Sequence, residues 1–216
     1  MSDRVEKGAG HICGEREGAV PIPRVKRCLK TVAAGLARVL VMPVYLSFLL
    51  REVMFGEQAF RASSQLVSLL PGFFGDYLRV AFYRLTLAAC GRDVQICFGT
   101  LFSSRRASIG DHVYIGTHCM VGNVEIARDV LLGSNVHLLS GQRQHGIGEI
   151  ERPIRLQERR ADRIRIGEDT WIGNGAIVMA HVGRKSVVGA GSVVVSDIPD
   201  LSLAAGNPAR VLRSRG

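Results

Sequence analysis

The sequence predicts a mainly β protein, a solenoid of short strands and turns that follows a helical segment. Branched aliphatic residues recur every six residues in the C-terminal half. This period fits neither a helix, which repeats at about 3.6 residues, nor a simple strand, which repeats at about 2. Glycine is also abundant, with 25 among 216 residues, about 12% against a usual ~7%. A solenoid in which three hexads complete one triangular coil accounts for both observations.

The composition limits the classes of protein to consider. Hydrophobic residues make up 47% and charged residues 22%, which excludes a disordered chain and permits a sizeable core. Lys and Arg exceed Asp and Glu by 28 − 19 = 9, which favours phosphorylated ligands or an anionic surface as partners. The basic residues are not interleaved with aromatics as a single-strand binding platform requires, so we expect no nucleic-acid partner.

The cysteines and the start of the chain indicate a cytoplasmic protein. Five cysteines without a CxxC pair, one of them left over, favour reduced thiols over a disulfide framework. Acidic and glycine-rich residues precede the first apolar run, unlike a secretory signal. Residues 1–23 are polar and punctuated by Gly and Pro, so we expect a disordered tail.

Residues 24–90 are expected to be helical and membrane-associating. The basic sequence RVKRCLK precedes TVAAGLARVLVMPVYLSFLL, which has about the 20 residues needed to span a bilayer. Arg38 lies near the middle of this run and Pro43 interrupts it. Three interpretations stay open: an interfacial or re-entrant helix on the anionic cytoplasmic surface, a true span, or a core helix.

Residues 51–89 predict two short amphipathic helices separated by Pro71-Gly72. In the second helix an apolar stripe is expected at 3–4 spacing. These helices either cap the solenoid or contact the membrane. The stripe consists of Leu78, Phe82, Leu85 and Ala89.

Residues 91–216 form the predicted solenoid domain. Four aliphatic triplets have strict six-residue steps, and Gly follows eight of the twelve residues directly. We expect the aliphatics to stack inward and Gly to supply unusual backbone at the corners. Two corners are shorter than six residues, which puts the geometry near residues 179–185 in doubt. The triplets are Ile109, Ile115, Val121; Ile126, Leu132, Leu138; Ile166, Ile172, Val178; and Val182, Val188, Val194.

The repeat is interrupted once, between Leu138 and Ile166. The excursion, with its extruded loop at 140–163, is polar and carries His145. Long excursions from a rigid scaffold are usually functional. An imidazole in such a loop can take a proton from a hydroxyl nucleophile.

Three motifs, TWIGNGAIV, SVVGAGSVVVSDIP and AAGNPARVLR, resemble those of the hexapeptide-repeat acyltransferases. The resemblance covers roughly residues 71–213. Within the family the chain looks most like the galactoside, maltose and nodulation O-acetyltransferases and the sugar acetyltransferases of polysaccharide clusters. It implies a left-handed parallel β-helix, a homotrimer with sites between subunits, and transfer of acetyl from acetyl-CoA to a hydroxyl of a sugar or an envelope or exopolysaccharide precursor.

The resemblance also implies the site residues. His145 follows Ser140-Gly141 at the position of the family's catalytic base. His137 and His118 are the alternative bases, and Glu149 or Glu151 could orient the imidazole or stay solvated. Trp171 either walls the thioester channel or fills a corner. The residues implied to bind coenzyme A are Trp171, Gly173, Asn174, Ala190, Val195, Ser196, Arg210 and Arg213.

Two other functions are weighed against acyl transfer. A non-catalytic β-helix scaffold would not need the extruded histidine loop. A zinc hydratase of the γ-type carbonic anhydrase kind needs three converging histidines, whereas residues six apart lie on different faces of the prism. We therefore expect no metal. The apolar helix suggests work at the cytoplasmic face of the inner membrane, while the acceptor and the exact acyl group stay open.

Overall fold

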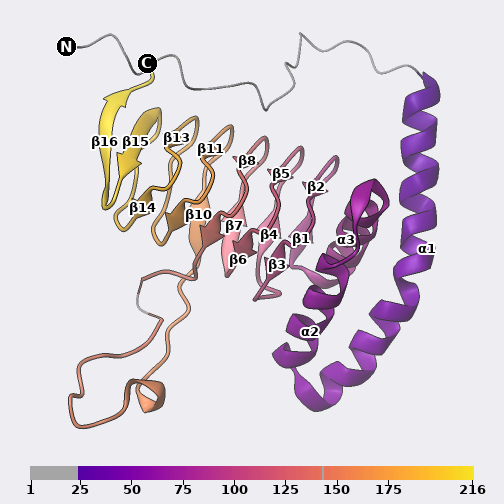
Figure 1. Ribbon diagram of the computed structural model, residues 1–216, viewed down its shortest axis with the longest axis horizontal. Helices are drawn as coiled ribbons and strands as arrows, with labels where there is room; N and C mark the ends of the chain where they lie inside the picture. Colours follow the sequence, from indigo (N-terminus) through magenta and orange to yellow (C-terminus); the bar gives the residue numbers. More distant parts are fainter. Residues whose placement is uncertain (1–23, 143) are drawn as a thin grey trace.

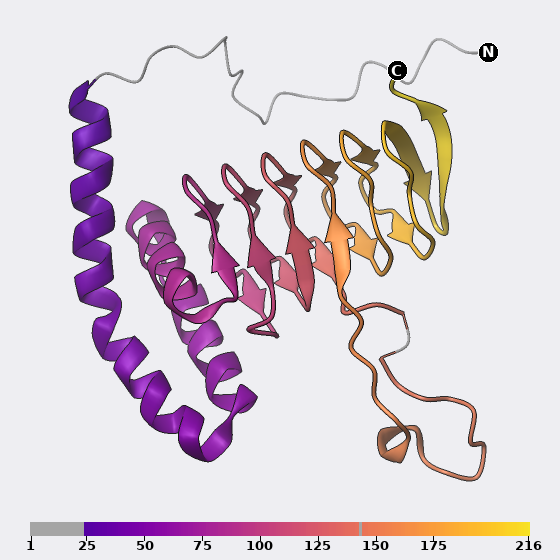
Figure 2. The same cartoon turned by 180° about the vertical axis from the view of Figure 1, so that it is seen from behind.

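The computed structural model describes residues 24–142 and 144–216 (Figure 1). Three helices lie at the first coil of a β solenoid, and the coils follow one another to the C-terminus, as the view from behind also shows (Figure 2). The predicted fold class is therefore confirmed. The tail predicted at residues 1–23 lies outside the described residues.

The helices are α1 Arg24–Phe55, α2 Glu57–Ser68 and α3 Gly72–Thr86. The first helix is longer than expected, because it includes the basic cluster and continues through Pro43 to Phe55. The predicted break at Pro71-Gly72 is correct, since α3 begins at Gly72 and Pro71 precedes it as the N-cap.

The helices pack through a buried aromatic cluster. Phe48 of α1 lies edge-on to Phe60 of α2 and Phe82 of α3, with ring centroids 6.4 and 6.2 Å apart. The stripe predicted for α3 is wrong in part, because Leu85 is exposed and Ala89 belongs to a strand. The buried face of α3 includes Phe82 of the stripe together with Arg79 and Tyr83, which the predicted stripe did not contain.

Short strands form three sheets along the solenoid, and all their pairings are parallel except β15 with β16. The first sheet contains β1 Ala89–Cys90, β4 Ser108–Ile109, β7 Val124–Ile126 and β10 Ile164–Ile166. The second contains β2 Gln95–Ile96, β5 Tyr114–Ile115, β8 Leu131–Leu132, β11 Trp171–Ile172, β13 Val187–Val188, β15 Ser202–Gly206 and β16 Ala209–Ser214. The third contains β3 Leu101–Phe102, β6 Met120–Val121, β9 His137–Leu138, β12 Ile177–Val178 and β14 Val193–Val194.

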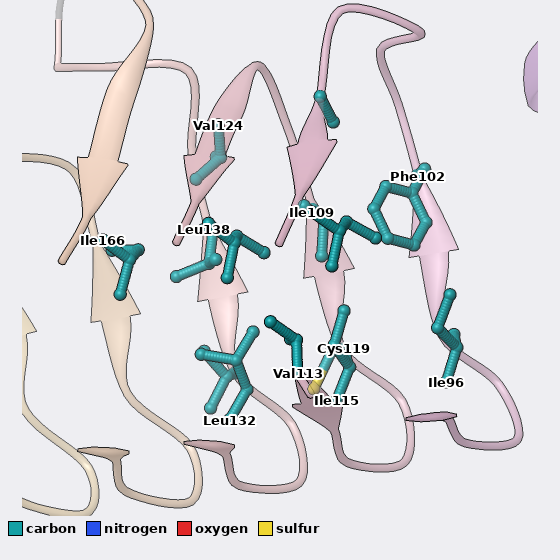
Figure 3. Close-up of a cluster of buried hydrophobic side chains, with 14 of the residues drawn as sticks. Ile96, Phe102, Ile109, Val113, Ile115, Cys119, Val124, Leu132, Leu138 and Ile166 are labelled. Carbon is teal, nitrogen blue, oxygen red and sulfur yellow. The ribbon is translucent and has the colours of Figure 1, made fainter. Parts of the chain in front are cut away.

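The aliphatic ladder forms the core of the solenoid. All twelve predicted aliphatics are at most 2% exposed, and Figure 3 shows several of them stacked inside the coils. Sequence reasoning missed the first coil, whose inward residues are Cys90, Ile96 and Phe102. These also follow at six-residue steps, so the spacing alone could have identified the coil.

The glycines have a different role from the one expected. None of the eight that follow an aliphatic residue has a positive φ. They are required because successive coils approach closely at these points. A Cβ on Gly167 would lie 2.3 Å from the backbone nitrogen of Arg184, and one on Gly173 would lie 2.5 Å from that of Ala190. Left-handed backbone occurs three residues after the aliphatics instead, as at His112 and Asn135.

The variation in coil length is confined to one corner. We number the corners one (first to second sheet), two (second to third) and three (third to the next strand of the first). Corner three takes seven residues from Phe102 to Ile109, five from Val121 to Ile126 and twenty-eight from Leu138 to Ile166. It takes four from Val178 to Val182, where the stack continues, because Val182 bridges Ile166 and Ile198.

Candidate active site

The long excursion leaves the solenoid at corner three, between β9 and β10, and Figure 1 shows it extending away from the coils. Its two ends are joined by a hydrogen bond from the Asp162 N–H to the Ser140 carbonyl, 3.1 Å. Gly141 has φ 78°, and a Cβ there would lie 2.8 Å from that of Asp162. The Ser140 hydroxyl accepts a hydrogen bond from the Asn123 N–H, 2.8 Å. The base of the loop is therefore anchored to the preceding coil.

The tip of the loop is organised around the side chain of Gln157. Its amide nitrogen donates to the Glu149 and Arg152 carbonyls, each at 2.8 Å, and its amide oxygen accepts from the Glu149 N–H at 3.2 Å. Gln157 is only 6% exposed. Sequence reasoning missed this residue, because a glutamine in a polar loop carries no signal of burial.

His145 is exposed and lines a hollow of about 330 Å³ with Gly146, Ile147, Glu158 and Arg160. The outgoing and returning segments of the loop are joined here by a hydrogen bond, in which the Gly146 N–H donates to the Glu158 carbonyl at 2.7 Å. Glu149 lies 3.5 Å from Arg152, and Glu151 is exposed. The solvated-loop interpretation therefore describes both carboxylates in this structure. Glu158, which sequence reasoning did not consider, lines the same hollow and is paired there with Arg160 at 3.3 Å.

The other described histidines belong to the solenoid. The ring of His118 packs edge-on to Phe98 at 5.5 Å and covers Gly99. Nδ1 of His181 accepts a hydrogen bond from the Arg165 N–H at 3.0 Å. His137 is half-buried on β9, and His112 occupies a turn 3.8 Å from Asp93. Each contributes to a coil or a turn, whereas His145 projects on the loop.

Three of the residues implied to bind coenzyme A stack at corner two. Gly173 and Asn174 follow β11, and Ala190 follows β13 in the next coil. The Asn174 side-chain oxygen accepts from the Ser134 N–H at 2.9 Å, and its carbonyl accepts from the Gly191 N–H at 2.8 Å. Asn174 thus links three successive coils and presents a rigid edge of turns to solvent.

Trp171 lies on the outer face of the second sheet and is 53% exposed. Its strand neighbours are Leu131 and Val187. The interpretation that this tryptophan fills a corner is therefore wrong, since β11 places it on a flat face before corner two. It is available to a ligand or to a second protein surface.

The remaining implied residues lie elsewhere. Val195 and Ser196 follow β14 at corner three, where the Gln142 side chain donates to the Val195 carbonyl and so links the loop to this turn. Arg210 and Arg213 are exposed on β16, the antiparallel C-terminal strand.

The implied residues therefore do not form one cluster within a chain. Asn174 and Ala190 lie at corner two and the base of the histidine loop lies at corner three, so the third sheet separates them. A site that uses both sets needs either a ligand long enough to cross this sheet or a second copy of the chain.

Neither a thiolate nor a metal site emerges from the described residues. Burial raises the pKa of the Cys90 and Cys119 thiols to about 11 each, so both stay protonated near neutral pH and are poor nucleophiles. No group of three His, Cys, Asp or Glu side chains that could hold a metal occurs in residues 24–142 and 144–216. His112, His118 and His137 lie at corner one, at corner two and on the third sheet.

Sequence comparison matches parts of the solenoid to a repeat family and to proteins named as acetyltransferases. Residues 106–140 and 163–196 match the family model described as the hexapeptide repeat of succinyl-transferase. A putative acetyltransferase of Saccharomyces cerevisiae is 36% identical over 110 residues, which cover 49% of this chain and 54% of that protein. A putative acetyltransferase of Staphylococcus aureus strain COL is 36% identical over 109 residues, 42% of this chain and 55% of that protein. The chain thus spans about half the length of these relatives.

Solved structures extend the match to the solenoid as a whole. A maltose O-acetyltransferase from Clostridium difficile superposes with a TM-score of 0.67 at 23% identity, over 76% of this chain and 89% of that chain. A galactoside acetyltransferase in complex with coenzyme A superposes with a TM-score of 0.63 at 25% identity, over 75% and 84%.

The chain is therefore a parallel β solenoid, and two stretches of it, residues 106–140 and 163–196, match the hexapeptide-repeat model. More particularly, it is similar in sequence and structure to proteins named as acetyltransferases, the galactoside enzyme among them.

Proposed function

We propose that this protein is an acyl-CoA-dependent O-acetyltransferase that acetylates a hydroxyl of a sugar or of an envelope or exopolysaccharide precursor. The observation that carries the proposal is His145, exposed on a loop that is anchored to the coils of a solenoid whose structural relatives are named sugar acetyltransferases. The donor is acetyl-CoA, in line with the coenzyme A bound to the galactoside acetyltransferase.

His145 acts as the general base in this proposal. The neutral imidazole takes the proton of the acceptor hydroxyl as its oxygen attacks the thioester carbonyl. The tetrahedral intermediate collapses with cleavage of the C–S bond, and the proton held by the imidazole passes to the leaving thiolate. The products are the acetyl ester and free coenzyme A, and no covalent enzyme intermediate forms.

The exposed turns of corner two are the proposed donor site. Coils held together by Asn174 offer a fixed edge for the pantetheine arm, next to Ala190. The exposed guanidinium groups of Arg210 and Arg213 suit the phosphates of the nucleotide. Trp171 supplies an apolar surface beside this edge.

Two further elements complete the proposal. The protein is a homotrimer in which the loop of one subunit meets the donor edge of its neighbour, because within one chain the third sheet separates them. It works at the cytoplasmic face of the inner membrane, where lipid-linked precursors are available as acceptors.

The test replaces His145 by Ala in the full chain. Coenzyme A release is measured with maltose and a galactoside as acceptors, and acetyl-CoA binding by calorimetry. Removal of a general base should lower transfer about 10²–10⁴-fold, while donor binding persists. The control is His112→Asn, at an exposed turn whose φ of 59° asparagine tolerates, and it should transfer normally. Full activity of His145→Ala would exclude this base, and a wild-type chain that does not bind acetyl-CoA would exclude the function.

A further inference from the structure

The outward face of α1 is apolar along most of the helix. Six exposed apolar side chains follow one another at alternating steps of four and three residues, and we call them the outer stripe. Pro43 occupies the position between Val39 and Leu46 in this series and is not counted in the stripe. Their exposures are 63% for Val32, 50% for Leu36, 67% for Val39, 53% for Leu46, 76% for Leu50 and 89% for Val53. At 100° per residue these positions lie on one side of the helix. Such a contiguous exposed apolar surface on a folded protein marks a contact with a partner or a membrane.

The opposite face of α1 is packed on protein. Ala37, Val41 and Phe48 are at most 2% exposed and belong to the core shared with α2 and α3. A core helix would be buried on both faces, whereas only 17% of the most apolar window in Leu29–Phe55 is buried. The core-helix interpretation therefore accounts for one face alone.

The charges of α1 favour an anionic membrane as the partner of the outer stripe. The helix contains six basic residues and one acidic residue, Glu52. Four of the basic residues, Arg24, Lys26, Arg27 and Lys30, belong to its first two turns. A basic cluster that precedes an apolar face is complementary to an anionic lipid surface, and each cation near such a surface contributes about 1 kcal/mol.

The contacts of the C-terminal part of α1 argue against a simple span. Arg51 donates to the Ser63 hydroxyl of α2 at 3.1 Å, and Glu52 forms an ion pair with Arg105 of the solenoid. A spanning helix faces hydrocarbon on all sides unless protein surrounds it. Insertion of α1 across the bilayer would therefore place this hydrogen bond, this ion pair and the polar face of α2 in lipid.

We propose that α1 lies in the surface of an anionic bilayer, with the outer stripe in the lipid and the inner face on α2 and α3. This inference explains how the protein would attach to the membrane proposed above, and it does not depend on the transfer activity. It also sets an orientation. The helices lie at the first coil (Figure 1), so the solenoid extends away from the bilayer and its C-terminal coils point into the cytoplasm. Three subunits with parallel solenoids would present three such helices to the same surface.

The test is flotation of the purified full chain with vesicles of phosphatidylglycerol and phosphatidylcholine, compared with phosphatidylcholine alone. The double variant Val32→Glu, Val39→Glu places two carboxylates in the outer stripe, and binding to the anionic vesicles should fall at least tenfold. The control Gln58→Glu, Gln65→Glu adds the same charge at exposed positions of α2 and should bind normally. Because all four positions are exposed, each variant should keep the melting temperature of the wild type.

Alkaline carbonate then distinguishes a surface helix from a span. Release of wild-type protein from cell membranes by carbonate supports the inference, and retention overturns it in favour of a span. Equal flotation of wild type and the Val32→Glu, Val39→Glu variant would also overturn it. Loss of self-association in that variant, with no flotation of the wild type, would assign the stripe to a second copy instead.

Discussion

Arg79 shows at the scale of a residue how the helices are fixed to the solenoid. Its side chain is fully buried, and its Nε donates to the Ile96 carbonyl of the first coil at 2.8 Å. Its Nη1 lies within reach of the Ser68 and Leu70 carbonyls, at the end of α2, where helical carbonyls lack partners within the helix. An ion pair with Asp76 completes the environment. One guanidinium thus joins α2, α3 and β2.

Replacement of Arg79 by Met should therefore destabilise the fold. Methionine fills much of the volume but removes the donor to the Ile96 and Leu70 carbonyls and the cation paired with Asp76. Breaking a buried ion pair costs about 3–5 kcal/mol. The measurement is the midpoint of guanidinium unfolding followed by circular dichroism. Arg92→Met is the matched control, since Arg92 is exposed and paired with Asp111 on the surface, and its midpoint should stay close to that of the wild type. Equal midpoints for both variants would contradict this role.

Single residues also show where sequence reasoning stops. Arg79 was not a candidate for the core, because a charged side chain is rarely buried unless it is paired, and its partners come from three elements. The number of glycines is visible in the sequence, but the unusual backbone expected at those that follow an aliphatic residue is wrong. Glycine is needed there because successive coils touch, and the residues in contact lie far apart in the sequence, 17 residues for Gly167 and Arg184 and 41 for Gly133 and Asn174. No local pattern contains such contacts.

The hexads predict the solenoid because the inward residue of each short strand must be apolar. The first coil was missed because Cys90 and Phe102 are not branched aliphatics, although their spacing from Ile96 is six. The loop was found because it interrupts this period. The hydrogen-bonded structure of the loop tip could not be predicted, because it depends on the side chain of Gln157. The partners of this side chain are three backbone groups several residues away.

The loop tip should unfold separately from the solenoid. Gln157→Leu removes three hydrogen bonds of the tip but no side chain of the aliphatic ladder. We expect cleavage by trypsin at Arg155, Arg159 or Arg160 to accelerate at least fivefold, and acetyl transfer to fall, while the melting temperature changes little. Mass spectrometry of the fragments locates the cleavage. Glu151→Gln, at an exposed position of the same loop, should be cleaved at the wild-type rate, and equal protection of the two variants would show that Gln157 does not hold the tip.

At the scale of the molecule, the coil stack gives a rigid prism with an edge of turns at corner two and a loop at corner three. Each copy carries both halves of the proposed site, but on opposite edges of the third sheet. The sequence alone could indicate the two sets of residues. It could not show that the two sets lie on opposite edges of the third sheet within one chain. That separation depends on which corner of the prism each hexad leads into.

A closed trimer would bring the loop of one subunit to the donor edge of the next, and mixed trimers test this arrangement. Light scattering should give about 70 kDa for three chains of 23.5 kDa each, after subtraction of any detergent. His145→Ala lacks the base, and the double variant Arg210→Ala, Arg213→Ala lacks the proposed phosphate contacts, so each alone should be nearly inactive. After co-expression in equal amounts, about a quarter of the interfaces should pair an intact loop with an intact donor edge, and about a quarter of the wild-type activity should return. If each chain contains a complete site, the mixture stays inactive, because every site then carries one of the two lesions.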